Sequence, residues 1–360
     1  MLDAAPTAAP ASAPVPATAE PVLKIEDLAV HFPIGGFLSF GGATVHAVDG
    51  VDMELRAGEC LGLVGESGCG KSTLALAILG LQAPTRGRIL LDGRDVSARG
   101  TDRRERARAA QMVFQDPYSS LNPRQSVRRT LEAPLRLHGI TARSEIEDRI
   151  AAVMRHVGLR PEQAARYPHE FSGGQRQRIG IARALILEPR IIVLDEPVSA
   201  LDVSIRAQII NLLLELKETM GLSYIMISHD LGVVEHMSDR VAVMYLGRIV
   251  ETGPWERIFT APRHPYTRAL IDAIPDPFGK GLGVRITGEI PNPLSPPPGC
   301  RFHPRCPEAR DFCKLEPAPG LDEVAGSGGD HLVRCLRAEE LAQTLGVARA
   351  AHSGASGGDI

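Results

Sequence analysis

One stretch decides the fold of this 360-residue chain: Gly65-Glu66-Ser67-Gly68-Cys69-Gly70-Lys71-Ser72. It fits the pattern G-x-x-x-x-G-K-[ST] and lies between a strand-like apolar run, Cys60 to Val64, and a helix-like run, Thr73 to Leu81. Its glycines let backbone N–H groups point at phosphate oxygens, and the following helix offers them its positive end. The alternative is a glycine-rich turn that binds nothing, which the strand–loop–helix setting disfavours. We therefore predict a phosphate loop that binds a nucleoside triphosphate, with Lys71 on the β and γ phosphates and Ser72 on Mg²⁺.

A second apolar run ends in two carboxylates. It is Ile191-Ile192-Val193-Leu194-Asp195-Glu196-Pro197, the pattern of a buried parallel strand whose acidic tip emerges beside the phosphate loop. We expect Asp195 to orient Mg²⁺ and Glu196 to polarise the attacking water. A solvated strand end is the alternative, but Ser199-Ala200-Leu201-Asp202 follows at once, and Ser228-His229-Asp230 ends the next apolar run.

A second glycine-bearing helix start follows the pattern Phe171-Ser172-Gly173-Gly174-Gln175, the signature segment. Ser172 is a good N-cap, and the paired glycines leave backbone N–H groups uncovered, so this helix start also favours an anion. One chain that binds one nucleotide has no evident need for two such sites. Two chains arranged head to tail do need them.

In their order and identity, these motifs resemble those of the ATP-binding cassette (ABC) ATPases, over about residues 22 to 275. The resemblance adds Gln115, in Gln111-Met112-Val113-Phe114-Gln115-Asp116-Pro117, as a glutamine loop that reports the nucleotide state. Phe171 replaces the usual Leu of the signature, a mild change. The resemblance implies three groups of site residues: catalytic Glu196, His229, Lys71 and Gln115; Mg²⁺ ligands Ser72, Gln115 and Asp195; and nucleotide contacts from Gly65 to Thr73, Gln115, Ser172 to Gln175, Asp195 and Asp202.

Phe32 falls where related cassettes place an aromatic ring that stacks on adenine. A core aromatic residue on a β strand is the alternative, because the glycine-rich segment after it blurs the alignment.

The pattern predicts an α/β fold of the phosphate-loop NTPase type. The resemblance implies a RecA-like parallel-sheet core and an antiparallel β subdomain. An inserted helical subdomain is expected at about 116–190, where runs such as Val127 to Leu137 and Ile146 to Val157 have helical period. We expect the cassette to span 21–275, after a disordered Ala/Pro-rich extension at 1–20 and before a C-terminal domain at 276–340 and a flexible tail at 341–360.

The C-terminal part indicates a branch of the family. Pro296-Pro297-Pro298-Gly299-Cys300-Arg301-Phe302-His303-Pro304-Arg305-Cys306, with His264-Pro265-Tyr266, resembles the extension of oligopeptide and dipeptide importer ATPases. Phe114 to Pro123 resembles the second of their two ATPase subunits. Importers of nickel, glutathione and some oligosaccharides carry the same extension, so the cargo stays open.

Four cysteines, Cys300, Cys306, Cys313 and Cys335, lie in this extension. A proline-rich segment with little apolar material benefits from a metal or cluster that cross-links it. No C-x-x-C pair specifies zinc, and the family resemblance implies a [4Fe-4S] cluster with these four ligands. Zinc or four free thiols are the alternatives. Cys69 is expected to be a small residue of the phosphate loop rather than a nucleophile.

Composition limits the partners. The net charge of −3 gives no nucleic-acid signal, and no apolar run approaches the length that crosses a bilayer. The resemblance implies ATP and Mg²⁺, a homologous ATPase partner, two permease subunits, indirectly a solute-binding protein, and a peripheral position on the cytoplasmic face of the inner membrane. Whether the cassettes pair as homo- or heterodimers stays open. A soluble ABC ATPase of DNA repair or translation is less consistent, because it would carry a coiled-coil insertion or a second cassette.

Overall fold

The computed structural model describes residues 21–34, 43–97, 102–116, 118–273, 286 and 288–342. The expectations for residues 1–20 and 343–360 lie outside these described residues. Among the described helices, none has both the length and the apolarity that a bilayer span requires.

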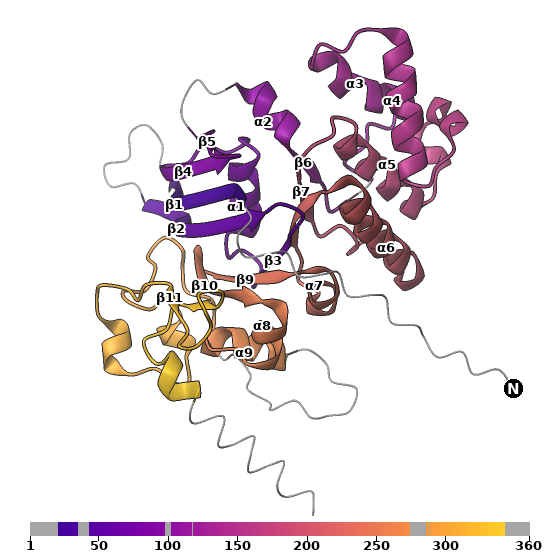
Figure 1. The fold of residues 1–360 in the computed structure, drawn as a ribbon. Helices are drawn as coiled ribbons and strands as arrows, with labels where there is room; N and C mark the ends of the chain where they lie inside the picture. The colour runs from indigo at the N-terminus through magenta and orange to yellow at the C-terminus, as the bar shows by residue number, and fades with distance from the viewer. Residues whose placement is uncertain are drawn as a thin grey trace, which may run out of the picture.

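An eight-stranded sheet forms the centre of the molecule, in the order β11-β12-β10-β9-β3-β8-β7-β6 (Figure 1). Its strands β3, β6, β7, β8 and β9 run parallel, and their continuous apolar sequences reflect burial on both faces. β9 and β10 form the predicted short-turn antiparallel pair. The bounds are β3 (Cys60–Val64), β6 (Ala110–Val113), β7 (Ile191–Asp195), β8 (Ser223–Ile227), β9 (Arg240–Tyr245) and β10 (Arg248–Pro254).

A second, antiparallel sheet confirms the predicted β subdomain. It has the order β2-β1-β4-β5, and its inner face shares one hydrophobic core with the main sheet and with α1 (Lys71–Ile78). The helix α1 ends before the predicted Leu81, because Gly80 turns the chain with a φ of +74°. The strands are β1 (Pro21–Ile34), β2 (Ala43–Arg56), β4 (Arg86–Leu91) and β5 (Arg94–Asp95).

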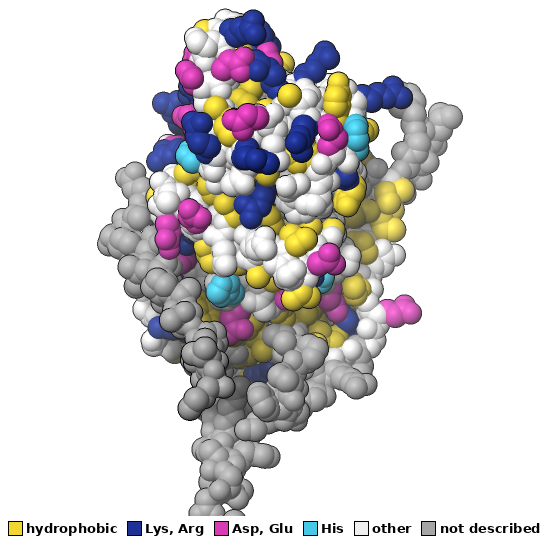
Figure 2. Space-filling view, turned by 90° about the vertical axis from the view of Figure 1, so that its right-hand side faces the viewer, with side chains coloured by type: hydrophobic (Ala, Val, Ile, Leu, Met, Phe, Trp, Pro, Cys, Tyr) yellow, Lys and Arg dark blue, Asp and Glu magenta, His cyan; other side chains and the backbone are white. Residues whose placement is uncertain are grey.

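The helical subdomain lies at the top right of Figure 1 and shares one hydrophobic core with strands of the main sheet. Helices α3 (Val127–Leu137) and α4 (Arg143–His156) bury one apolar face each, and Gly158, with a φ of +71°, follows the end of α4 as expected for a C-terminal cap. Figure 2 shows Lys or Arg interspersed with Asp or Glu over this part, as in the pair Arg128–Glu147. The subdomain also holds η1 (Pro161–Ala165), η2 (Pro168–Glu170) and α5 (Gly173–Leu185).

The described part of the C-terminal extension, 288–342, does not form a separate lobe. Its strands β11 (Asp322–Glu323) and β12 (Leu332–Val333) continue the main sheet beyond β10. The extension lies beside α8 and α9, below the antiparallel sheet (Figure 1). The remaining elements are α2 (Arg103–Ala109), α6 (Val203–Met220), α7 (Leu231–Met237), α8 (Trp255–Thr260), α9 (Pro265–Asp272), η3 (His303–Arg305) and η4 (Asp311–Lys314).

Candidate functional site

Parallel strands bring the distant motifs to one edge of the main sheet. β3 runs into the phosphate loop, β6 precedes Gln115, β7 ends at Asp195 and β8 precedes His229. The strands are in register, since Leu194 pairs with both Val113 and Met226. The carboxyl ends of parallel strands are the usual ligand position in open α/β sheets, and these motifs therefore meet at one site.

A cavity of about 540 Å³ opens at this edge. Most of the predicted nucleotide-binding and catalytic residues line it, together with other residues that belong to no predicted motif. The residues that line it are Val45, His46, Ala47, Gly65, Ser67, Gly68, Gly70, Lys71, Ser72, Thr73, Gln115, Asp195, Glu196, Ile227, His229, Leu246, Gly247 and Pro293. The additional residues come from β2, the end of β8, the β9–β10 turn and the extension, and sequence reasoning missed them because only long-range packing brings them here.

The phosphate loop depends on two of its glycines. A Cβ at Gly65 would lie 2.1 Å from the carbonyl oxygen of Met244, and one at Gly70 would lie 2.2 Å from that of Ala47; both positions have positive φ. The loop can therefore pack this closely on its neighbours only with glycine at both places. Lys71 is buried, and its ammonium donates to the carbonyl oxygens of Gly65 (2.7 Å) and Glu66 (2.9 Å).

Cys69 and Glu66 do not line the cavity, although both belong to the phosphate loop. The Cys69 side chain is buried, and burial raises the pKa of its thiol, so it is a protonated, small packing residue rather than a nucleophile. The Glu66 side chain instead pairs with the extension, as described below.

Glu196 is the centre of the catalytic group. Its Oε2 accepts a hydrogen bond from Gln115 Nε2 at 2.7 Å, and its Oε1 lies 2.9 Å from His229 Nδ1. Its φ of +47° is uncommon for a residue with a side chain, and such backbone strain concentrates at functional sites. Burial and the neighbouring Glu196 charge raise the pKa of Asp195, while Lys71 opposes this rise. The predicted Gln115, Asp195, Glu196 and His229 thus lie together.

The signature segment and Asp202 are not among the residues that line this cavity. Ser172 caps α5: its hydroxyl accepts from the Gln175 N–H at 3.4 Å, and the Gln175 side chain accepts from the Ser172 N–H at 3.1 Å. This reciprocal capping fixes the start of the helix. Gly174 is tightly packed as well, since a Cβ there would lie 2.5 Å from Ile205 Cγ2.

Phe32 does not line the cavity either. Its ring is partly buried and packs against the core shared by the two sheets, which is the arrangement of the core aromatic residue given as the alternative above. His46 of β2 does line the cavity, and its backbone N–H donates to the carbonyl oxygen of Pro293 at 3.1 Å.

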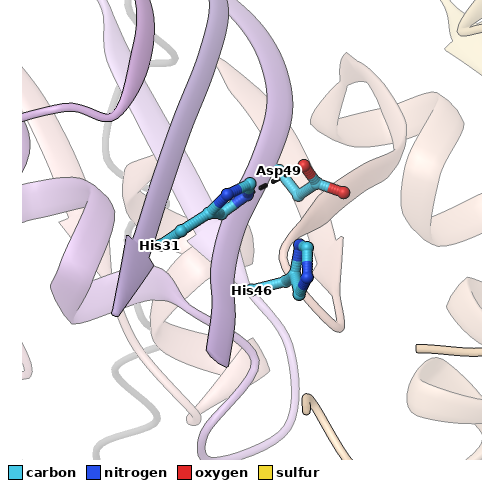
Figure 3. A group of neighbouring side chains, drawn as sticks. All are labelled: His31, His46 and Asp49. Atoms are coloured by element: carbon cyan, nitrogen blue, oxygen red, sulfur yellow. Dashed lines mark hydrogen bonds and ion pairs between the residues drawn. The ribbon is translucent and has the colours of Figure 1, made fainter. Parts of the chain in front are cut away.

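Among the described residues, one group of three His, Cys, Asp or Glu side chains has all its ligand atoms within 4.8 Å: His31, His46 and Asp49 (Figure 3). Asp49 is already engaged, because Oδ1 lies 3.0 Å from His31 Nε2 and Oδ2 accepts from both Arg248 and Arg301. Two guanidinium groups oppose a further cation there. We therefore interpret the group as an anchor that joins β2 to the extension, not as a metal site.

The four extension cysteines line one small cavity of about 20 Å³, the cysteine pocket. All are free thiols, and burial raises the pKa of Cys306 to about 12 and that of Cys335 to about 11. Since the described cysteines contribute no group of three within 4.8 Å, their sulfurs are more widely spaced than one tetrahedral zinc ion requires, for which Zn–S distances of about 2.3 Å apply.

Comparisons with known proteins agree with this geometry. A family model described as "ABC transporter" matches residues 48–199, and one described as "Oligopeptide/dipeptide transporter, C-terminal region" matches residues 250–313. The di/tripeptide transport ATP-binding protein DppF of Pseudomonas aeruginosa is 50% identical over 300 residues, which cover 82% of this chain and 93% of that protein. The oligopeptide transport ATP-binding protein AppF of Bacillus subtilis is 48% identical over 326 residues, covering 89% and 98%.

Solved structures show the same fold. The cassette cbiO1 from Clostridium perfringens, described as part of an ABC transporter complex, has a TM-score of 0.58 at 29% identity, covering 67% of this chain and 91% of its own. A dimeric structure of the cassette MJ0796 bound to ADP and Pi has a TM-score of 0.57 at 27% identity, covering 65% and 98%. The chain therefore belongs to the ABC transporter family, in the branch of ATP-binding subunits that carry the oligopeptide/dipeptide transporter C-terminal region.

Proposed function

We propose that this chain hydrolyses ATP to energise the uptake of di- or oligopeptides through a membrane permease, from the cytoplasmic face of the inner membrane. The observation that carries the ATPase part is the placement of Gln115, Glu196 and His229 around one cavity with the phosphate loop. The peptide cargo rests on the extension and on the names of the two relatives reported above, which refer to di/tripeptide and oligopeptide transport.

An uptake assay tests the cargo. We expect a deletion strain to lose uptake of radiolabelled di- and tripeptides, and the wild-type chain to restore it, because the ATPase is required for each transport cycle. Nickel, glutathione and an oligosaccharide are measured in parallel. If the deletion strain loses uptake of one of these compounds but keeps peptide uptake, that compound replaces peptide as the proposed cargo.

The geometry of the cavity supports specific roles for residues that line it. Lys71 and the phosphate-loop amides would hold the β and γ phosphates, while Ser72, Asp195 and Gln115 offer oxygen ligands to Mg²⁺. When bound, Mg²⁺ neutralises charge that develops on the transferred phosphoryl group. Glu196 would polarise the attacking water, and His229, 2.9 Å from Glu196, would fix the orientation of that carboxylate.

A second polypeptide would complete the site. The signature segment has its own capped helix start but does not line the cavity of its own chain, which supports a head-to-tail pair in which Ser172 to Gln175 meets the partner's nucleotide. We propose a homologous ATPase as that partner, with two permease subunits and, indirectly, a solute-binding protein. We propose residues 21–275 as the cassette and 276–340 as the cysteine-bearing extension, whose strands β11 and β12 continue the main sheet of the cassette.

The chemistry of the cysteine pocket supports the proposal of a [4Fe-4S] cluster. Four thiol side chains line one cavity, and thiolates are the ligands that such clusters use. The raised pKa values of Cys306 and Cys335 describe the free thiols, and ligation would have to deprotonate them. We propose Cys300, Cys306, Cys313 and Cys335 as the cluster ligands.

Anaerobically purified protein is then expected to be brown, with about four irons per chain. Cys306→Ser should remove most of the iron and the visible absorption and lower the melting temperature of the chain, because the cluster cross-links the extension. Cys60→Ala, which removes a sulfur from β3 outside the pocket, is the control and should retain the iron and the visible absorption. A colourless protein with one zinc would replace the cluster by a structural zinc site, and a metal-free protein with an unchanged melting temperature would contradict both.

A further inference from the structure

An ion pair links the phosphate loop to the extension. Glu66 turns its carboxylate away from the cavity and towards Arg305 of η3, whose Nη1 and Nη2 donate to Oε2 at 2.7 Å and to Oε1 at 3.0 Å. The two residues are 239 positions apart in the sequence. Two parallel N–H···O bonds between a guanidinium and a carboxylate form the strongest and most directional kind of side-chain pair.

The surroundings make this pair rigid. Arg305 is buried, its guanidinium lies 5.8 Å from the centre of the Tyr245 ring, and its Nη1 also lies 3.4 Å from the Tyr245 hydroxyl. Tyr245 packs against Tyr266 and Phe302, with ring centres 4.6 and 5.2 Å away. The aromatic group thus fixes the guanidinium in one orientation and excludes water from one side of the pair.

The backbone of Glu66 is held as well. Its N–H donates to the Tyr266 hydroxyl at 2.9 Å, and its carbonyl oxygen accepts from Lys71 Nζ at 2.9 Å. The same residue therefore joins three structures: the extension through Arg305, α9 through Tyr266, and the phosphate-binding ammonium through Lys71. A shift of Glu66 would move the loop amides and Lys71 together.

Arg305 also lies next to Cys306, one of the cysteines of the pocket. The cysteine-bearing segment is anchored at a second point by Arg301, whose guanidinium donates to Asp49 of β2 and, at 2.6 Å, to the carbonyl oxygen of Leu246. Leu246 lines the nucleotide cavity. The segment between Cys300 and Cys306 thus contacts the phosphate loop through Arg305 and one lining residue of the cavity, Leu246, through Arg301.

We propose that Arg305 is a positioning residue for the phosphate loop, so that nucleotide affinity depends on the docked extension. This inference rests on the nucleotide site proposed above. While Arg305 holds Glu66, the phosphate loop already has its binding conformation before the nucleotide arrives. Without Arg305 the loop would have to become ordered on binding, and this entropy cost would weaken the affinity for nucleotide. Removal of Arg305 would also leave the Glu66 carboxylate half-buried without its partner, which favours rearrangement of that residue.

The test measures binding of Mg²⁺·ATP labelled with N-methylanthraniloyl to the purified full-length chain. Arg305→Met keeps much of the side-chain volume but removes the charge, and we expect its Kd to rise about tenfold, equivalent to about 1.4 kcal/mol. Arg257→Gln is the control: Arg257 pairs with Asp330 at 2.6 Å and ties α8 to the extension away from the phosphate loop. Its Kd should stay within about twofold of wild type.

A double-mutant cycle separates positioning from general destabilisation. Glu66→Gln removes the charge that Arg305→Met leaves unpaired, so the double variant should bind nucleotide better than the product of the two single effects predicts. Arg305→Lys, which retains the charge but not the paired bonds, should lie between wild type and Arg305→Met, and it serves as the variant if Arg305→Met does not fold.

Three results would overturn the inference. The first is a wild-type Kd for Arg305→Met, the second is multiplicative effects in the cycle, and the third is an equal loss of affinity in Arg257→Gln, which would show that any loosening of the extension suffices. If the wild-type chain does not bind ATP, that result would instead contradict the nucleotide site proposed above. Thermal melting of every variant shows which affinity changes accompany a folded chain.

Discussion

Glu196→Gln is expected to lower the turnover of ATP by at least about a hundredfold, while ATP still binds. The amide keeps the shape of the side chain and can still contact Gln115 and His229, at 2.7 and 2.9 Å in the native protein, but it lacks the charge that polarises water. Phosphate release by the complex with its partner ATPase measures turnover, and fluorescent-nucleotide titration measures binding.

Glu235→Gln provides the matched control for this change. Glu235 is an exposed acid on α7 that does not line the cavity, so its replacement alters the net charge equally without touching the site. Its turnover should equal that of the wild type. Near-normal turnover of Glu196→Gln in the same complex would remove Glu196 from its assigned role.

The chain purified alone is expected to hydrolyse ATP slowly, and addition of the partner ATPase should raise turnover by about a hundredfold or more. The reason is that the signature amides act as charge-stabilising donors supplied in trans, and the loss of one such donor typically costs about 10²–10³ in kcat. Steady-state phosphate release is measured against partner concentration, with the oligomeric state of each sample determined by light scattering.

Ser172→Ala sharpens this test. It removes the cap of α5 at the signature and should lower the activity of the complex. Ser126→Ala is the control, because it removes an equivalent cap from α3, where the Ser126 hydroxyl accepts from the Arg129 N–H at 3.3 Å, and it should leave the activity unchanged. Only the first helix start is expected to meet a nucleotide. Full activity from a strictly monomeric preparation would contradict the shared site.

Most of the fold could be predicted because its signals are local. The phosphate loop needs glycines with positive φ before a helix, and the structure has them at Gly65, Gly68 and Gly70. Apolar runs in the sequence predict the parallel strands, and apolar residues at helical spacing predict α3 and α4. The addition of β11 and β12 to the main sheet had no such signal, since two-residue strands carry no periodicity.

Phe32 shows the limit of motif alignment. An aromatic residue on a strand is compatible both with stacking on adenine and with packing in the hydrophobic core, and the sequence does not distinguish these two roles. In the structure Phe32 is partly buried and packs against the hydrophobic core, while His46 lines the cavity. Burial of one face of β1 against a core decides which way the side chain points, and that core is assembled from segments far apart in the chain.

The sequence by itself determined the phosphate loop, the acidic strand and the capped signature segment, because each depends on the conformational preferences of a few adjacent residues. Only the tertiary structure decided which of them meet. Gln115 and His229 reach Glu196 from 81 and 33 positions away, and Arg305 reaches Glu66 from 239. Such contacts depend on strand order, register and the packing of the extension, which arise from the whole core at once and leave no mark in any short stretch.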